Sequence, residues 1–475
     1  MLKTRHLILG AGPAGLGAAL RLQEAGVDWL ICEREAEPGG LSASFVDERG
    51  FTWDYGGHVL FSHYETFDKR INAARPHAGA WLDHRRESWI WQGDRFIPYP
   101  FQYNLHRLPP EGAAACLRGV EEALRVRHDT PPANFRELLL RSFGLPICEH
   151  FMFPYNDKVW AWPLDEMDCD WIGERVAMPD IARIRAGFEQ RRDDKSWGPN
   201  NAFRFPDRGG TGAIWKALAD GLPPEHLRFR AEAVAVDASA RTVRFRGGDV
   251  IGYDACISTI PLDQLAALAD DPALTPRIPL RASATRVIGI GLAGTPPPDI
   301  RTKCWMYFPC ANSPHYRVTV FSNYSPSHVP GPGPQWSLMA EVSESPVKRV
   351  DADGLVQTCV NALVEDGLIP DPAQIVSTTM RRVPYGYPTP FLGRKACVAE
   401  LLAALEARSL YSRGRFGAWT YEAGNMDHAF MQGYECVGRL LNGGGPECEP
   451  TLNTPHVVNS RYNPESEAFH APAKP

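Results

Sequence analysis

The sequence predicts an α/β protein in which a Rossmann-type nucleotide-binding domain carries two insertions, one helical and one an antiparallel β-sheet. Three observations support this fold class. A short apolar run at residues 7–9 leads directly into a glycine-rich turn and a helical pattern. Helical patterns recur within 111–143, and strand patterns dominate from 285 to 343. The 475 residues provide material for about three domains.

The first 33 residues predict a βαβ unit that binds a nucleotide. A strand at 7–9 is followed by a G-x-G-x-x-G turn, a helix to Ala25, and a second strand at 29–32. The three glycines let the backbone approach a pyrophosphate at the helix N-terminus. Glu33 would accept hydrogen bonds from both ribose hydroxyls and would repel a 2′-phosphate, which disfavours NADP here. The expected cofactor contacts are Gly10, Gly12, Gly15 and Glu33.

A second glycine pair favours FAD over NAD. Gly39, Gly40, Leu41 and Ser42 follow the ribose-binding acid and resemble the extended FAD fingerprint of the glutathione-reductase-like flavoproteins. Residues 253–261 resemble the strand and loop that re-enter the FAD domain in that superfamily. The predicted FAD-binding domain is therefore discontinuous, with residues 1–95, 200–278 and 385–475. The helical domain covers 96–199, and the antiparallel-sheet domain covers 279–384.

The remaining elements follow from periodicity. Helices are expected near 111–127, 134–143, 354–367 and 398–408. Strands are expected near 228–247, 254–260, 285–292, 303–308, 316–323 and 336–343. The alternation in 317–321 suits a half-solvated antiparallel sheet. The proline-rich stretch 325–334 predicts an exposed connector, and the polar tail after Tyr462 predicts a frayed end.

Composition and charge are those of an ordinary globular protein. Apolar residues make up 44% and charged residues 22%, which excludes a mainly disordered, collagenous or coiled-coil chain. The net charge of −6 gives no bulk reason to bind nucleic acid. No apolar run approaches the ~18 residues of a membrane span. Eleven cysteines without C-x-x-C spacing predict free thiols, no metal site and a cytoplasmic location.

A series of spaced motifs is difficult to explain by packing alone. They are GGHVLFS at 56–62, PYNDKVW at 154–160, WIGER at 171–175, WGPNN at 197–201, KCWMYFP at 303–309, YR at 316–317, YGYPTP at 385–390 and YEAGNMDH at 421–428. In this order, over about residues 5–458, they closely resemble the UDP-galactopyranose mutases, the eukaryotic-type branch more than the bacterial one. Met426 stands where that branch has glutamine, and the segment 326–336 is shorter than in fungal relatives.

This resemblance implies an isomerase of the flavin-dependent NDP-sugar mutase family. Such enzymes interconvert UDP-galactopyranose and UDP-galactofuranose without net redox change. The N5 atom of reduced flavin attacks the anomeric carbon of the sugar, and UDP leaves and returns. The resemblance therefore implies FAD in its reduced form, a UDP-sugar as substrate, and NAD(P)H as a candidate reductant. It also allows a homo-oligomer.

The resemblance also assigns site residues. His58, Arg175 and Arg317 are the expected catalytic residues, with both arginines on the diphosphate. The expected substrate contacts are Tyr99, Gln102, Phe151, Asn156 and Trp160 for the uridine, Tyr307, Tyr387 and Tyr421 for the phosphates, and Asn200, Trp305, Arg415 and Asn425. Further flavin contacts are Gly57, His58, Gly424, Asn425 and Met426, and the NAD(P)H contacts are Arg86 and Ser88. Segments 172–180 and 197–202 resemble mobile flaps.

Other interpretations stay open at this point. Each arginine could form an ordinary surface salt bridge, Phe151 and Trp160 could be core residues, and Arg86 could be a solvated charge. A mutase for a different NDP-hexose would share the same motifs. A redox flavoenzyme, such as an amine or porphyrinogen oxidase, would share the same fold. A catalytically inactive binding protein would need a lost His58 or arginine, and neither is missing.

Overall fold

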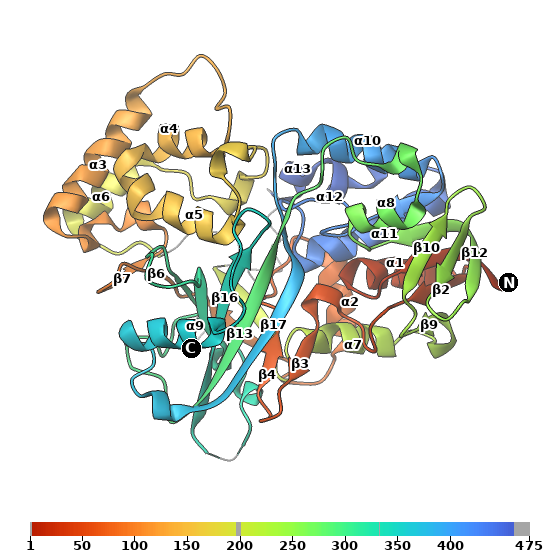
Figure 1. Cartoon of the computed structure of the whole chain (residues 1–475), viewed down its shortest axis with the longest axis horizontal. Coiled ribbons are helices and arrows are strands. Elements are labelled where there is room, and N and C mark those ends of the chain that lie inside the picture. The colour runs from red at the N-terminus through yellow and green to blue at the C-terminus, as the bar shows by residue number, and fades with distance from the viewer. Residues whose placement is uncertain (1, 196–200, 332, 460–475) are drawn as a thin grey trace.

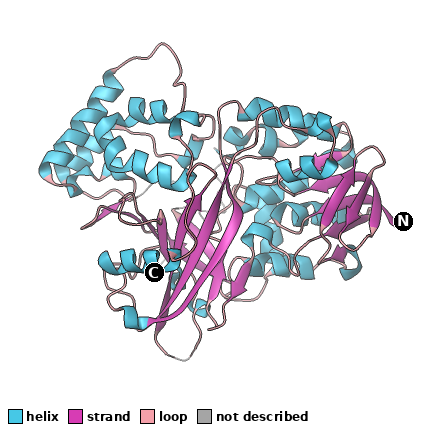
Figure 2. Ribbon diagram, viewed as in Figure 1, coloured by secondary structure: helices cyan, strands magenta, loops and turns pink. Residues whose placement is uncertain are grey.

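The computed structural model describes residues 2–195, 201–331 and 333–459. Figure 1 shows helices α3, α4, α5 and α6 grouped at one end and strands β2, β10 and β12 at the other, with β13, β16 and β17 between them. Helices cover strands in both halves of the molecule (Figure 2). The predicted α/β fold class is therefore confirmed. In the described part of the chain, no helix has both the length and the apolar character needed to cross a bilayer.

The first sheet is the predicted nucleotide-binding sheet. Its seven strands are β1 (Leu2–Leu9), β2 (Trp29–Cys32), β9 (Leu227–Arg228), β10 (Ala233–Asp237), β11 (Thr242–Phe245), β12 (Val250–Ser258) and β18 (Leu410–Ser412). The order is β10-β11-β12-β1-β2-β9, and β18 pairs with the end of β12. β1 pairs in parallel with both β2 and β12. The strand predicted at 253–261 thus re-enters beside the first strand.

Helices cover both faces of this sheet. α1 (Pro13–Glu24), α2 (Glu65–Ala74), α7 (Gly212–Asp220) and α11 (Met426–Asn442) share a core with Ile8 and Ile31. α8 (Leu262–Ala269) and α10 (Arg394–Glu406) share a core with Leu7 and Leu9. Neighbouring strand residues point to opposite faces, so this division follows directly from the alternating side chains of β1. The short helices α12 (Pro450–Asn453) and α13 (Pro455–Asn459) follow α11.

The second sheet joins distant parts of the chain. It runs β17-β13-β16-β15-β14-β6-β7. The strands are β6 (Ser88–Trp91), β7 (Phe96–Pro98), β13 (Ala282–Ala293), β14 (Trp305–Tyr307), β15 (Arg317–Val320), β16 (Gln335–Glu344) and β17 (Ile375–Pro388). Pairing is antiparallel except between β6 and β14. The boundaries expected at residues 95 and 384 fall inside this sheet, and the division into three domains stays a prediction.

Both faces of this second sheet are covered. Val318 and Val320 of β15 pack in the core beneath α9 (Leu355–Glu365), while Thr319 faces the opposite side and is fully buried. The prediction of a half-solvated strand at 317–321 is therefore wrong, because the polar face of β15 is covered by another part of the chain. The expected exposed connector at 325–334 is also wrong in part, since Ser325 and His328 are buried.

The helical part consists of α3 (Pro110–Arg125), α4 (Phe135–Ile147), α5 (Phe153–Trp160) and α6 (Ile181–Gln190). Its core includes Ile90, Ile97, Trp305 and Tyr307, so the helices pack directly on β6, β7 and β14. Two small ladders complete the fold, β3 (Ser44–Val46) with β4 (Thr52–Asp54), and β5 (Trp81–Arg85) with β8 (Ala202–Pro206). All eleven cysteines are free, as expected.

Candidate functional site

The glycine-rich turn at the end of β1 has the close contacts that the fingerprint requires. Gly10 has a φ of +101°, and a Cβ on Gly15 would lie 1.8 Å from the carbonyl oxygen of Gly10. Helix α1 begins directly after Gly12, which adopts an extended conformation at the N-cap. The first N–H groups of α1 and its positive end are therefore available to a phosphate group.

The second glycine pair lies against the first turn. The Gly39 N–H donates to the Ala11 carbonyl at 2.9 Å. A Cβ on Gly12 would come within 3.8 Å of the Gly40 Cα, so any side chain there would fill the space between the two turns. Leu41 packs between two hydrophobic cores, and the Ser42 carbonyl accepts from the Thr211 hydroxyl. The paired turns fit a dinucleotide pyrophosphate.

Glu33 is buried at the end of β2, beside these turns. One carboxylate oxygen accepts the Ala11 N–H at 2.6 Å, and the other accepts the Glu35 N–H at 2.9 Å. A carboxylate offers about four acceptor positions, so two remain for the hydroxyls of a ribose. The backbone thus orients Glu33 as the fingerprint predicts.

The Gly-Gly-His segment lies over the polar face of the second sheet. A Cβ on Gly57 would lie 3.2 Å from the Thr319 hydroxyl and 3.3 Å from the Trp305 Nε1 atom, which explains the glycine. Burial lowers the pKa of His58 to about 4; Glu341 opposes this shift and Arg317 adds to it. The His58 imidazole is therefore neutral at pH 7. Its Nδ1 atom has no hydrogen-bond partner among the described residues.

Arg317 and Glu341 form a buried ion pair on the same face. They are opposite one another in β15 and β16. The Arg317 Nε atom donates to one Glu341 oxygen, and Nη2 donates to the other at 2.8 Å. The carboxylate is only 3% exposed. The guanidinium also lies over the Trp305 ring, 5.6 Å from its centroid. The interpretation of Arg317 as a surface salt bridge is therefore wrong.

Phenol groups surround this ion pair. Tyr307 is opposite Arg317 in β14, and the Tyr316 hydroxyl lies 3.4 Å from Glu341 and 3.3 Å from the Tyr387 hydroxyl. The Tyr387 and Tyr421 rings are 5.9 Å apart. Burial raises the pKa of Tyr307 and of Tyr387 above the usual value, so both phenols keep their protons at neutral pH. They are hydrogen-bond donors for an anion.

Two further guanidiniums lie beside the Tyr421 ring, and one of them also lies beside Tyr387. Arg415 lies 5.3 Å from the Tyr387 centroid and 5.5 Å from the Tyr421 centroid. Arg175, in a 3₁₀ turn (Gly173–Arg175), lies 5.6 Å from the Tyr421 centroid. Their hydrogen bonds go to neutral oxygens of Asn425, Glu422, Gly424 and Gly386. Within the described part of the chain, no carboxylate lies within ion-pair distance of either arginine.

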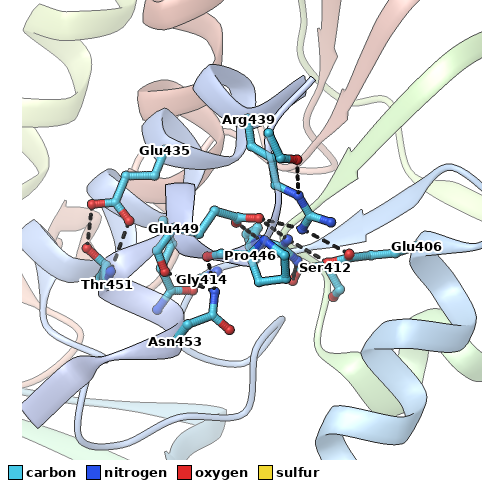
Figure 3. Close-up of polar contacts among 12 residues, drawn as sticks. Glu406, Ser412, Gly414, Glu435, Arg439, Pro446, Glu449, Thr451 and Asn453 are labelled. Atoms are coloured by element: carbon cyan, nitrogen blue, oxygen red, sulfur yellow. Dashed lines mark hydrogen bonds and ion pairs between the residues drawn. The ribbon is translucent and has the colours of Figure 1, made fainter. Parts of the chain in front are cut away.

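A buried ion-pair network holds the segment that carries Arg415. Arg413 is fully buried and donates to both oxygens of Glu449. Arg439 donates to Glu449 as well, and Figure 3 shows these two side chains beside Glu406. The Gly414 N–H donates to the Gln432 side chain at 2.7 Å. Breaking such a buried pair costs about 3–5 kcal/mol. The backbone before Arg415 is therefore fixed to the C-terminal helices.

Aromatic side chains line the side of the site nearest the helices. Phe151 stacks on Tyr155 at 5.1 Å, and Tyr155 meets Tyr307 edge-on at 5.2 Å. Tyr99 also meets Tyr307, at 5.4 Å, and Trp160 meets Tyr421 at 4.9 Å. Phe151 and Trp160 thus belong to the helical core and contact the site at the same time.

The two predicted uridine amides bind backbone carbonyls. The Gln102 amide nitrogen donates to Ala177 at 2.6 Å, and the Asn156 amide nitrogen donates to Met152 at 2.7 Å. The Gln102 Oε1 atom is buried without a partner in the described chain. Because Ala177 lies in the predicted flap 172–180, Gln102 ties that segment to the residues that follow β7.

Arg86 and Ser88 lie beside the same aromatic group. Arg86 is buried and lies 6.0 Å from the Tyr99 centroid and 5.9 Å from the Trp305 centroid. Ser88 is opposite Trp305 in the parallel pairing of β6 and β14. The interpretation of Arg86 as a solvated charge is therefore wrong.

The start of α11 borders the site. Asn425 is the N-cap of α11, and its Oδ1 atom accepts from Arg175 at 3.0 Å. Gly424 packs against Arg415, and Met426 is buried in the core. Behind them, His63, Asp427 and His428 bring their ligand atoms within 4.8 Å of one another. The positive helix end disfavours a cation there, so we interpret this group as a hydrogen-bonded support of α11.

The structure thus brings together most of the predicted site residues. Asn200 and most of the second predicted flap lie outside the described residues. Sequence reasoning missed Glu341 and assigned no role to Tyr155 or Tyr316. A signal existed for Glu341, because it is the one charged residue in the strand pattern at 336–343.

Several known proteins resemble this chain in sequence and fold. The family model for flavin containing amine oxidoreductases matches residues 13–441. A crystal structure of a reduced UDP-galactopyranose mutase is 46% identical, covers 97% of this chain and 98% of its own, and superimposes with a TM-score of 0.92. A protein assigned as a protoporphyrinogen oxidase from Exiguobacterium sp. 255-15 shares the fold at 17% identity, 93% and 99% coverage and a TM-score of 0.68.

Curated relatives are more distant. The zeta-carotene desaturase of Solanum lycopersicum is 21% identical over 302 residues, which is 58% of this chain. The aligned part spans only half of the desaturase's own length.

Proposed function

The chain belongs to the flavin-containing amine oxidoreductase family and, within it, to the UDP-galactopyranose mutases, and from this premise we propose that it interconverts UDP-galactopyranose and UDP-galactofuranose. FAD is the cofactor of this isomerase. One observation carries the choice of substrate class. Arg175 and Arg415 both lie beside the Tyr421 ring, and Arg415 also lies beside Tyr387, without a carboxylate partner in the described chain. This is the arrangement expected for a diphosphate.

The two glycine turns and Glu33 would hold FAD, with the pyrophosphate at the start of α1. When bound and reduced, FAD supplies the nucleophile for the anomeric carbon of the sugar. His58 and Gly57 would lie against the ring system of the flavin. Gly57 is packed closely against Trp305 and Thr319, so a side chain at this position would clash with them. A neutral His58 offers one N–H donor there without adding charge.

The residues of the chain would bind the UDP part at both ends. Arg175, Arg317 and Arg415 would neutralise the diphosphate while it is detached from the sugar, and the tyrosine hydroxyls would donate to its oxygens. Tyr99, Phe151 and Trp160 would enclose the uracil ring. Closing the flap at 172–180 would bring Arg175 onto the phosphates and exclude water.

Other expectations remain proposals. We propose a cytoplasmic location, which the eleven free thiols support. NAD(P)H as the reductant, bound near Arg86 and Ser88, and assembly into a homo-oligomer are proposals as well.

The test is to incubate the dithionite-reduced protein with UDP-galactofuranose and to separate the nucleotide sugars by chromatography. We expect UDP-galactopyranose to form, and none to form with the oxidised protein. Conversion of a different furanose nucleotide alone would assign another NDP-hexose as substrate. Oxygen uptake with an amine or a porphyrinogen, without sugar conversion, would overturn the isomerase.

A further inference from the structure

A single lysine side chain fills the loop that joins two strands of the site. Lys158 lies on α5, and its ammonium donates to the carbonyls of Phe308 at 2.9 Å, Cys310 at 2.5 Å and Ser313 at 2.7 Å. The His315 carbonyl is a further acceptor at 3.3 Å. These residues form the connection between β14 and β15, so one ammonium holds four carbonyls of this loop.

This ammonium is held by carbonyl dipoles rather than by an acid. In the described part of the chain, Lys158 has no carboxylate within ion-pair distance. Burial lowers the pKa of Lys158 to about 8, so the group still carries its charge at pH 7. Its three N–H donors are all occupied by this loop, which leaves none for a substrate or a proton transfer.

A second connection joins α5 to the residues that follow β16. The Lys348 ammonium donates to the Asp157 carbonyl at 3.0 Å, and the Ser345 hydroxyl donates to the Ala161 carbonyl at 2.5 Å. Both acceptors lie at the C-terminal end of α5, where the helix dipole favours a cation. The Asp157 carbonyl also accepts the Ala161 N–H at 3.2 Å, so Lys348 adds a second donor to a carbonyl that is already bonded within the helix. Helix α5 is therefore fixed to the second sheet from two sides.

The two joined elements carry the two halves of the proposed substrate site. Tyr155 and Trp160 lie on α5, on the side assigned to the uridine. Tyr307 and Arg317 lie on either side of the loop that Lys158 fills, on the side assigned to the diphosphate. A nucleoside diphosphate can form its best contacts in both subsites at once only when the distance between the subsites is fixed.

We propose that Lys158 is a positioning residue that sets the distance between the uridine and diphosphate subsites. This inference rests on the proposed function. Its consequence is that Lys158 contributes to the binding of a ligand that spans both subsites and little to the binding of one that engages mainly the uridine side.

The test compares UDP with UMP as ligands of the FAD-loaded protein by calorimetry. In Lys158→Met, which keeps the chain length and removes the N–H donors, we expect UDP to bind about tenfold or more weakly, with UMP affected less than about threefold. Lys69→Met, the same change on the exposed face of α2, is the matched control and should leave both constants unchanged. Thermal midpoint and flavin content are recorded for every variant.

Equal weakening of UDP and UMP, or no change in either, would overturn the positioning role. If Lys158→Met does not fold, Lys348→Met tests the same connection from its other side, and an unchanged ratio of the two constants there would overturn the role. Wild-type protein that binds neither nucleotide would contradict the proposed function and the inference with it. Wild-type protein that binds UDP, with an unchanged ratio in the variants, would contradict only the role of Lys158.

Discussion

Arg317 and Glu341 lie opposite each other in adjacent antiparallel strands, and the guanidinium holds the carboxylate through Nε and Nη2. Among the described residues, Glu341 accepts from Nε and Nη2 but not from the other terminal nitrogen, Nη1, which we propose would contact the diphosphate. Glu341 therefore orients the guanidinium while reducing the free positive charge of the site. An arginine side chain that is already ordered in this way loses less conformational entropy when it binds an anion.

Arg317→Ala should strongly reduce turnover while the protein keeps its flavin. Truncating one member of a buried charge pair typically costs 2–5 kcal/mol of binding, so we expect kcat/KM to fall by about 30-fold to several-thousand-fold. The measurement is conversion of UDP-galactofuranose, with flavin absorbance recorded on the same sample. A colourless variant would mean that Arg317 holds the cofactor or the fold instead.

The contribution of the Arg317–Glu341 pair to protein stability can be measured separately from its contribution to activity. Glu341→Ala leaves a buried guanidinium unpaired and should lower the free energy of unfolding by about 3–5 kcal/mol. The double variant Arg317→Met/Glu341→Met removes both charges and should recover most of that loss without recovering activity. Urea unfolding at pH 7 measures both. A double variant as unstable as Glu341→Ala would show that the pair acts by something other than charge compensation.

His58 should not titrate in the neutral range. Its pKa of about 4 in the folded protein lies below the usual 6.5, so the ring stays neutral from about pH 5.5 upwards. His58→Asn should lower kcat/KM by roughly tenfold to a hundredfold, the value of a hydrogen bond to a charged group. The ratio of wild type to variant should stay constant between pH 5.5 and 8. A change in that ratio centred near pH 6.5 would contradict a neutral His58.

Gly12→Val should yield a folded protein without flavin. The new side chain would occupy the space between the two glycine turns, where the Gly40 Cα lies 3.8 Å from the Cβ position. Gly438→Ala is the matched control, because a Cβ there meets nothing within 4 Å. Circular dichroism reports the fold and the absorbance ratio reports flavin. Retention of flavin in Gly12→Val would place the pyrophosphate elsewhere.

His315 should make the protein sensitive to acid. It is fully buried, and burial lowers its pKa to about 3, with the Lys158 charge adding to the shift. The unfolded chain takes up this proton below about pH 6.5 and the folded protein does not, so the free energy of unfolding falls as the pH falls. The slope from this one group is at most about 1.4 kcal/mol per pH unit.

His315→Phe should therefore flatten the loss of stability between pH 6 and 4.5, measured by urea unfolding at several pH values. The exposed His128→Asn should keep the wild-type slope. An unchanged slope in His315→Phe would show that other groups bind the protons.

The local part of the fold was accessible from the sequence. The βαβ unit at residues 5–33 depends on neighbours in the chain, and β1, α1 and β2 lie where its pattern predicts them. Pairings between distant segments were not accessible. Nothing in residues 88–91 indicates a parallel partner at 305–307, and nothing in residue 317 alone indicates that Glu341 faces it.

Prediction of the site residues from the sequence has the same limit, because contacts between distant segments are not visible in it. Arginines and tyrosines were predicted from motifs, because a family pattern marks them one by one. Glu341 and Lys158 were not, since their roles depend on a strand register and on a loop that closes around a side chain. The alternation at 317–321 predicted a strand correctly. It could not show whether the polar face of that strand is exposed to solvent, because distant chain segments cover that face.

The position of β6 and β7 limits how the protein can be rebuilt. These strands come from residues 88–98, yet they complete a sheet whose other members span 282–388. A chimera that exchanged only 282–388 with another mutase would place a foreign β14 beside the native β6 and disturb the register that sets Ser88 against residue 305. To exchange this sheet between relatives, segments 88–98 and 282–388 must therefore be replaced together, while the helices between them stay in place.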